Sequence, residues 1–150
     1  MKINYAFLFF LSAMVFASSC SKEKQIATNL TSQAGRWNID NYKVTEIITT
    51  PSITFPPTIT DLSDLGYMNF FDNNDGQIFF IYDVGDYDFI EFEWTPTEQG
   101  IFLEYSNEEF EYVFTTNEKD RIVMVNTIVV PLDDTTTKTT EKEYELLRIE

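Results

Sequence analysis

The chain has 150 residues, a formal net charge of −15, a single cysteine and no histidine. This acidic balance argues against nucleic-acid binding, because phosphate contacts need a basic surface. The lack of histidine excludes serine–histidine and cysteine–histidine catalysis and zinc sites of the usual composition. We therefore expect a protein that is not an enzyme and that needs no metal or other cofactor.

The N-terminus has the composition of a secretory signal. One lysine, Lys2, precedes an uncharged run of 13 residues from Tyr5 to Ala17, and small residues follow. A membrane-spanning helix needs about 20 apolar residues, whereas a shorter apolar run before small residues is typical of a signal peptide. We predict that residues 1–19 are a signal peptide.

The residues "ASSC" at 17–20 resemble the lipobox of bacterial lipoproteins, in which the cysteine is lipidated and becomes the new N-terminus. Ala17 and Ser19 depart from the commonest residues of that motif. The resemblance implies lipidation of Cys20 and membrane attachment through two or more acyl chains. Ser21 follows the cysteine where aspartate would favour the inner membrane. The resemblance therefore also implies attachment to the outer membrane of the cell envelope, on its periplasmic or its outer side. The alternative is an ordinary cleaved signal, with Cys20 incidental.

The mature chain divides into two parts by composition. Residues 20–34 are polar and lack a helical period, so we predict a lipidated tether with at most one helical turn, near Leu30. From residue 35 to residue 150, β-branched and aromatic residues dominate between clusters of asparagine, aspartate, glycine and proline. This pattern predicts one β domain.

Eight β-rich runs indicate an all-β fold. Their short connections favour antiparallel neighbours, because parallel pairs need long crossovers. Eight such strands can close into an up-and-down barrel, and an open β-sandwich is the alternative. The longer connections 49–65 and 131–140 predict an open mouth opposite a closed base. The predicted strands are 36–48, 66–72, 77–83, 88–95, 101–105, 109–115, 121–130 and 141–149.

Alternation along the strands predicts which side chains face the interior. In the run 88–95, Ile90, Phe92 and Trp94 alternate with Glu91 and Glu93, so one face is buried and the other is solvated. Side chains of this size either fill the barrel or leave room for one small ligand. The predicted interior set is Trp37, Ile39, Ile90, Phe92, Trp94, Ile101, Leu103, Tyr105, Phe110, Tyr112, Phe114, Tyr144 and Leu146.

The first and last strands carry a family resemblance. "GRW" at 35–37 opens the first strand, and "YELLRIE" at 144–150 forms the last. With eight strands and a long first loop, these features resemble the lipocalin-like domains of bacterial surface lipoproteins. The resemblance implies that Trp37 plugs the barrel base, that Gly35 admits a close backbone, and that Arg148 packs within about 6 Å of the indole ring. Arg148 departs from the family in lying within the last strand, so a surface charge is the alternative.

Two functions remain open. One is a membrane-anchored protein that binds a small apolar or amphipathic ligand under the loops 49–65 and 131–140, with Phe55, Tyr87 and Tyr105 at the mouth. The other is a non-catalytic module with a filled core that contacts an envelope protein through its outer face and loops. Paired carboxylates could in principle hydrolyse glycosides, but they share the solvated strand faces, so we do not expect catalysis from them.

Overall fold

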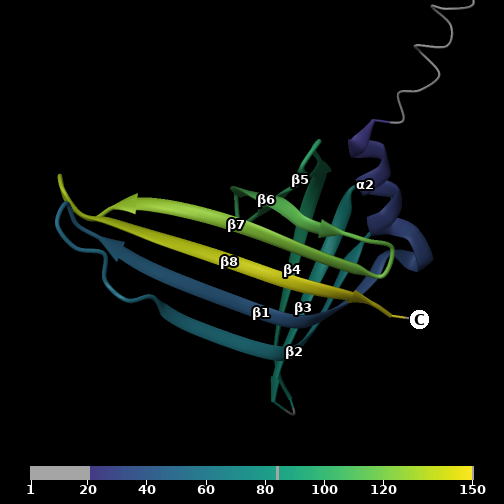
Figure 1. Ribbon diagram of the computed structural model, residues 1–150. Helices are drawn as coiled ribbons and strands as arrows, with labels where there is room; N and C mark the ends of the chain where they lie inside the picture. Colours follow the sequence, from purple (N-terminus) through teal and green to yellow (C-terminus); the bar gives the residue numbers. More distant parts are fainter. Residues whose placement is uncertain (1–20, 84, 150) are drawn as a thin grey trace, which may run out of the picture.

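The computed structural model describes residues 21–83 and 85–149 of the chain. It forms a closed barrel of eight antiparallel strands in chain order, as predicted, and β1 pairs with both β2 and β8 (Figure 1). This closure excludes the open sandwich. The predicted signal peptide and Cys20 lie outside the described residues. The strands are β1 (Arg36–Thr49), β2 (Thr58–Phe70), β3 (Asp75–Asp83), β4 (Asp86–Pro96), β5 (Gly100–Tyr105), β6 (Glu108–Asn117), β7 (Arg121–Pro131) and β8 (Thr137–Arg148).

The barrel wall is complete near one end and open toward the other. The β4–β5 ladder runs from Glu93 to Pro96, and the β6–β7 ladder runs from Val113 to Asn117. The strands β7, β8, β1 and β2 continue beyond this ring side by side, as a four-stranded sheet (Figure 1). We call this extension the wing; it comprises residues 40–49, 58–65, 126–131 and 137–145.

The two connections predicted to be long are short. The β1–β2 connection spans 50–57 and the β7–β8 connection spans 132–136, both at the tip of the wing. The prediction of two long loops over a mouth is therefore wrong. Strand β2 begins at Thr58 because its β-branched residues pair with β1, and Thr58 and Thr60 lie opposite Glu46 and Val44.

Side chains fill the closed end of the barrel. Trp37, Tyr112 and Phe70 are the largest side chains that are less than 2% exposed. The Phe70 ring packs edge-on against the rings of Phe92 and Trp94, with centroids 5.5 and 5.6 Å away. All 13 residues predicted to face inward belong to the buried cluster or pack against it. The alternation therefore predicts these residues correctly, but the predicted set contains no residue of β2, β3 or β7, where Met68, Ile78 and Met124 are buried.

A helix covers the closed end, next to the C-terminal end of the chain (Figure 1). Helix α2 (Lys22–Thr31) leads into the 3-10 turn η1 (Ser32–Gly35), and the helical residues Ile26 and Leu30 are buried. In place of the single helical turn expected near Leu30, the residues from Lys22 to Thr31 form a helix that packs on the barrel. Two apolar residues four positions apart give little periodicity, and packing on the barrel stabilises this short helix.

Candidate functional site

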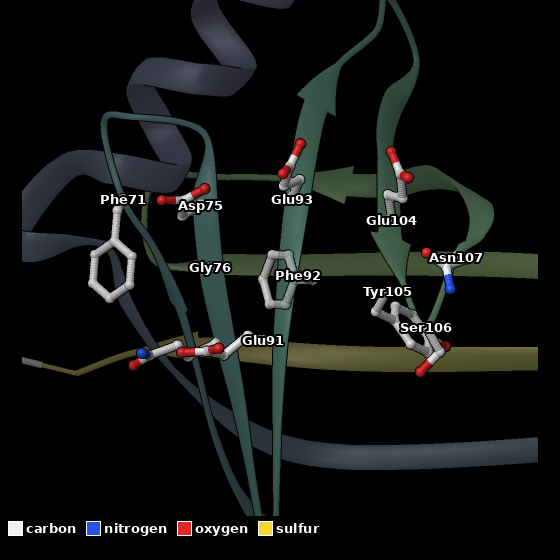
Figure 2. A pocket seen from close by; sticks show the side chains of 11 residues that line it. Phe71, Asp75, Gly76, Glu91, Phe92, Glu93, Glu104, Tyr105, Ser106 and Asn107 are labelled. Atoms are coloured by element: carbon white, nitrogen blue, oxygen red, sulfur yellow. The ribbon is translucent and has the colours of Figure 1, made fainter.

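A cleft of about 480 Å³ opens in the barrel wall where β4 and β5 separate (Figure 2). Their ladder ends at the pair Glu93–Glu104, and β5 soon turns back through Ser106 and Asn107, which have positive φ angles of 56° and 62°. From 86 to 92, β4 pairs with β3 and, in the described part of the chain, with no strand on its other side. The cleft therefore results from the short β5–β6 hairpin.

The inner side of the cleft is aromatic. Phe92 is 4% exposed, and Tyr105 is half-buried and stacks on Phe110 with centroids 4.7 Å apart. Gly76 makes room for Phe92, because a Cβ atom at Gly76 would lie 2.2 Å from the Phe92 ring. Phe71, 37% exposed, adds a further ring at the edge. These rings offer an apolar contact surface behind a solvent-exposed opening.

The outer rim is acidic. Asp75 lies opposite Glu93, Glu93 lies opposite Glu104, and Glu104 lies opposite Glu109, so four neighbouring strands each contribute one carboxylate to a single line. We call these four residues the carboxylate row; Figure 2 shows Asp75, Glu93 and Glu104 beside the cleft. Directly opposite side chains in a sheet have Cβ atoms about 4.5–5.5 Å apart, and like charges there are destabilising.

Tyr105 connects the cleft with a tyrosine cluster in the barrel interior, formed by Tyr42, Tyr105, Tyr112 and Tyr144. The ring of Tyr144 lies 4.6 Å from that of Tyr42 and 5.8 Å from that of Tyr112, centroid to centroid. The phenol of Tyr105 interacts with that of Tyr112. Burial raises the pKa of each phenol above its usual value, most strongly for Tyr112 and Tyr144. The four phenols therefore stay neutral at physiological pH and keep their hydroxyl protons.

The side chain of Asn126, at the end of the β6–β7 ladder, has a buried acceptor atom. Its Nδ2 donates to the backbone oxygen of Glu111 at 2.9 Å, while its Oδ1 is buried without a hydrogen-bond partner among the described residues. Asn126 follows the last pair of the β6–β7 ladder, Val113–Val125. Its side-chain amide thus bridges the two strands where their backbones separate.

The three residues predicted for the barrel base come together. The guanidinium of Arg148 lies 3.8 Å from the centroid of the Trp37 ring, inside the expected distance of about 6 Å. The Arg148 side chain is 2% exposed, so it is no surface charge. Gly35 has φ +67°, and a Cβ atom there would lie 1.9 Å from the backbone oxygen of Phe70. These contacts close the end that α2 covers.

The three residues predicted for a ligand mouth do not come together. Phe55 lies in the connection at the wing tip and is 48% exposed. Tyr87 stacks on Phe79 at 5.1 Å on the outer face of β4 and is 59% exposed. Tyr105 alone of the three lines the cleft. The strand alternation could have placed Tyr87 correctly, because it is out of phase with the inward-facing Ile90 and Phe92.

The sequence did not reveal the carboxylate row or the cleft. Alternation assigns Glu93 and Glu104 to a solvated face, but it does not say which residues lie opposite each other on neighbouring strands. That register depends on the turns, such as the two-residue turn at Ser106 and Asn107. A reliable assignment of that turn would have revealed the pair Glu104–Glu109, whereas the other two pairs of the row depend on the turns that join β3, β4 and β5.

Within residues 21–83 and 85–149, no group of three or more acidic or other metal-ligating side chains is arranged to hold a metal ion. None of the helices in the described ranges has the length and apolar character needed to cross a bilayer. Comparison with protein-family models, curated proteins and solved structures found no match to this chain. The evidence for its function is therefore the geometry of its own residues.

Proposed function

We propose that this chain is a lipid-anchored protein of the cell envelope that binds a small amphipathic ligand in the cleft between β4 and β5. The supporting observation is the cleft itself. Its volume of about 480 Å³ lies in the range of roughly 300–1,000 Å³ that is common for small-molecule sites. Aromatic rings at its inner side and polar groups at its rim suit a ligand with one apolar and one polar part.

The filled base favours a site in the wall over a site deep in the barrel. Trp37, Ile39 and Leu146 are each 0% exposed, so the closed end holds side chains where a lipid tail would need space. We propose binding and not catalysis. Ser106 lines the cleft, and no histidine can activate it because the chain has none.

A lipid anchor on Cys20 would fix the orientation of the barrel. Ser21 alone separates Cys20 from helix α2, which begins at Lys22 and packs on the closed end through Ile26 and Leu30. An acylated Cys20 would therefore hold the closed end near the membrane. The wing would extend away from it.

Native mass spectrometry of protein extracted from its own membrane tests the proposal. We expect the mass of an acylated chain starting at Cys20, and a further mass from a retained ligand. The variant Cys20→Ser should lose both acylation and cleavage. The variant Tyr105→Ala removes an inner side chain of the cleft and should lose the ligand, whereas Tyr87→Ala on the outer face should keep it. Equal retention in both tyrosine variants would contradict a site in this cleft.

A second function is favoured by an aromatic cluster on the outer face. Tyr67 stacks on Phe79 at 5.2 Å and Phe79 stacks on Tyr87 at 5.1 Å. Tyr87 and Phe89 are 59% and 47% exposed, respectively. Exposed aromatic side chains are enriched at protein interfaces, so this cluster supports an interaction module. A partner cross-linked in the envelope should be lost in Tyr87→Ser/Phe89→Ser and kept in Tyr105→Ala.

A further inference from the structure

The carboxylate row and the rim of the cleft coincide. Asp75, Glu93 and Glu104 of the row line the cleft, and Glu91 adds a fourth carboxylate to its rim. No lysine or arginine among the described residues lines it. The cleft therefore has a strongly negative rim around an opening large enough for a small molecule.

The carboxylate row lacks the ion pairs with basic side chains that other carboxylates of the chain form. Glu46 pairs with Lys138 at 2.6 Å, and Glu145 pairs with Arg121 at 2.6 Å. In the part of the chain that the structure describes, no member of the carboxylate row forms such an ion pair. Like charges placed directly opposite each other oppose folding, so a cation supplied from outside would relieve an unfavourable arrangement that the chain leaves uncompensated.

The aromatic side of the cleft indicates which kind of cation would bind there. The rings of Phe92 and Tyr105 lie behind the acidic rim, and Phe71 lies at its edge. Cations with apolar substituents gain from both carboxylates and ring faces. A divalent metal ion is less suited, because no three carboxylates of the described chain converge as metal ligands.

We infer that the ligand of this cleft is a small organic cation, an ammonium or guanidinium compound with an apolar or aromatic body. The inference rests on the proposed function, because it concerns the same cleft. The cation would lie between the carboxylates of Glu93 and Glu104, and its apolar body would contact Phe92 and Tyr105. An anionic compound with the same body would be repelled by the rim.

Three probes with the same ring and different charge test the inference: benzyltrimethylammonium, benzyl alcohol and benzenesulfonate. They are titrated into the full-length protein in detergent micelles, with protein-free micelles as the blank, and binding is followed by saturation-transfer NMR. We expect the cation to bind about tenfold more tightly than the alcohol. We expect no measurable binding of the sulfonate.

Two double variants separate a local site from attraction by the whole acidic protein. Glu93→Gln/Glu104→Gln removes two charges of the row and should weaken binding of the cation about tenfold. Glu141→Gln/Asp134→Asn makes the same change in net charge on the wing and in the connection at its tip, away from the cleft, and should leave the affinity unchanged. Circular dichroism verifies that both variants fold.

The outcomes distinguish the inference from the proposed function. Equal weakening by both double variants would mean nonspecific attraction and would overturn the inference. If the alcohol or the sulfonate binds as tightly as the cation and Tyr105→Ala abolishes that binding, the inference fails while a ligand site in the cleft stands. If no probe binds, the inference fails, and the proposed function fails with it when native mass spectrometry also shows no retained ligand.

Discussion

The guanidinium of Arg148 lies over the ring of Trp37 at 3.8 Å and at the same time holds helix α2 in place. Its nitrogens donate to the backbone oxygens of Asn29 and Ser32, each at 2.7 Å, and of Lys119 at 2.8 Å. The first two carbonyls lie at the C-terminal end of α2, where the helix dipole favours a positive charge. One side chain thus joins the helix, the first strand and the β6–β7 turn.

Replacing Arg148 should destabilise the fold more than its position near the C-terminus suggests. Arg148→Met keeps apolar contact with Trp37 but removes every donor, and we expect a loss of about 3 kcal/mol in the free energy of unfolding. Arg148→Lys should be intermediate, because an ammonium cannot reproduce the planar fork. Urea unfolding followed by tryptophan fluorescence measures both.

Arg36 provides the control for this prediction. Its guanidinium lies 4.2 Å from the centroid of Tyr67, but the side chain is exposed. Arg36→Met should therefore cost no more than about 1 kcal/mol. Equal losses for Arg36→Met and Arg148→Met would show that the contacts of Arg148 with α2 contribute little.

The pair Trp37–Arg148 was expected from the resemblance to lipocalin-like domains, and the topology and the strand phase support it. In an eight-stranded barrel the last strand lies beside the first, and Arg148 shares a face with Tyr144 and Leu146. The role of α2 could not be predicted in this way. Its stability comes from packing of Ile26 and Leu30 on the barrel, and a sequence of ten mostly polar residues gives no sign of a partner surface.

The cleft and its carboxylates could not be predicted either, because they depend on how neighbouring strands are aligned. Whether Glu93 lies opposite Glu104 depends on how many residues each hairpin turn uses, and a shift by one residue would move every side chain of a strand to the other face. Alternation identified the buried face of five of the eight strands, because that signal lies within the strand. Which residues of two strands lie opposite each other depends on the register between the strands, and the pattern within one strand does not give that register.

Leu30 tests whether α2 belongs to the folded domain. Its side chain is 0% exposed, so Leu30→Ala should lower the free energy of unfolding by about 2–5 kcal/mol. Gln25→Ala on the exposed side of the same helix should change it by less than about 0.5 kcal/mol. Chemical denaturation of the two variants gives the comparison. An unchanged stability for Leu30→Ala would mean that residues 22–31 act as a tether and do not stabilise the folded domain.

The tyrosine cluster predicts a loss of stability in alkali. Burial raises the pKa of Tyr112 and Tyr144 above the value of about 10 that they have when unfolded. Above that pH the unfolded chain loses phenol protons that the folded chain retains, so the free energy of unfolding falls as pH rises. The fall is about 1.4 kcal/mol per pH unit for each such tyrosine.

Urea unfolding at several pH values between about 9 and 12 measures this slope. Tyr144→Phe removes one titrating phenol, so its stability should fall less steeply than that of the parent protein by about 1.4 kcal/mol per pH unit. The variant also changes the contacts of residue 144 with the rings of Tyr42 and Tyr112, so its stability at neutral pH serves as the reference. An identical slope in both proteins would contradict a neutral, buried Tyr144.

The carboxylate row predicts that removing charge from the cleft makes the protein more stable. Glu93 lies directly opposite Glu104, so Glu93→Gln/Glu104→Gln removes a repulsive pair and should raise the free energy of unfolding by about 0.5 kcal/mol at low salt. The gain should shrink in 1 M salt, where charges are screened beyond about 3 Å. In the control Glu141→Gln/Asp134→Asn, Glu141 lies opposite Thr45 and Thr127, so no directly opposed charges are removed. A smaller gain is expected there.

If the row variant is less stable than the control, the carboxylates hold the strands together in some way other than through charge. If it is more stable, any loss of cation binding in the same variant reflects the missing charges and not a damaged fold.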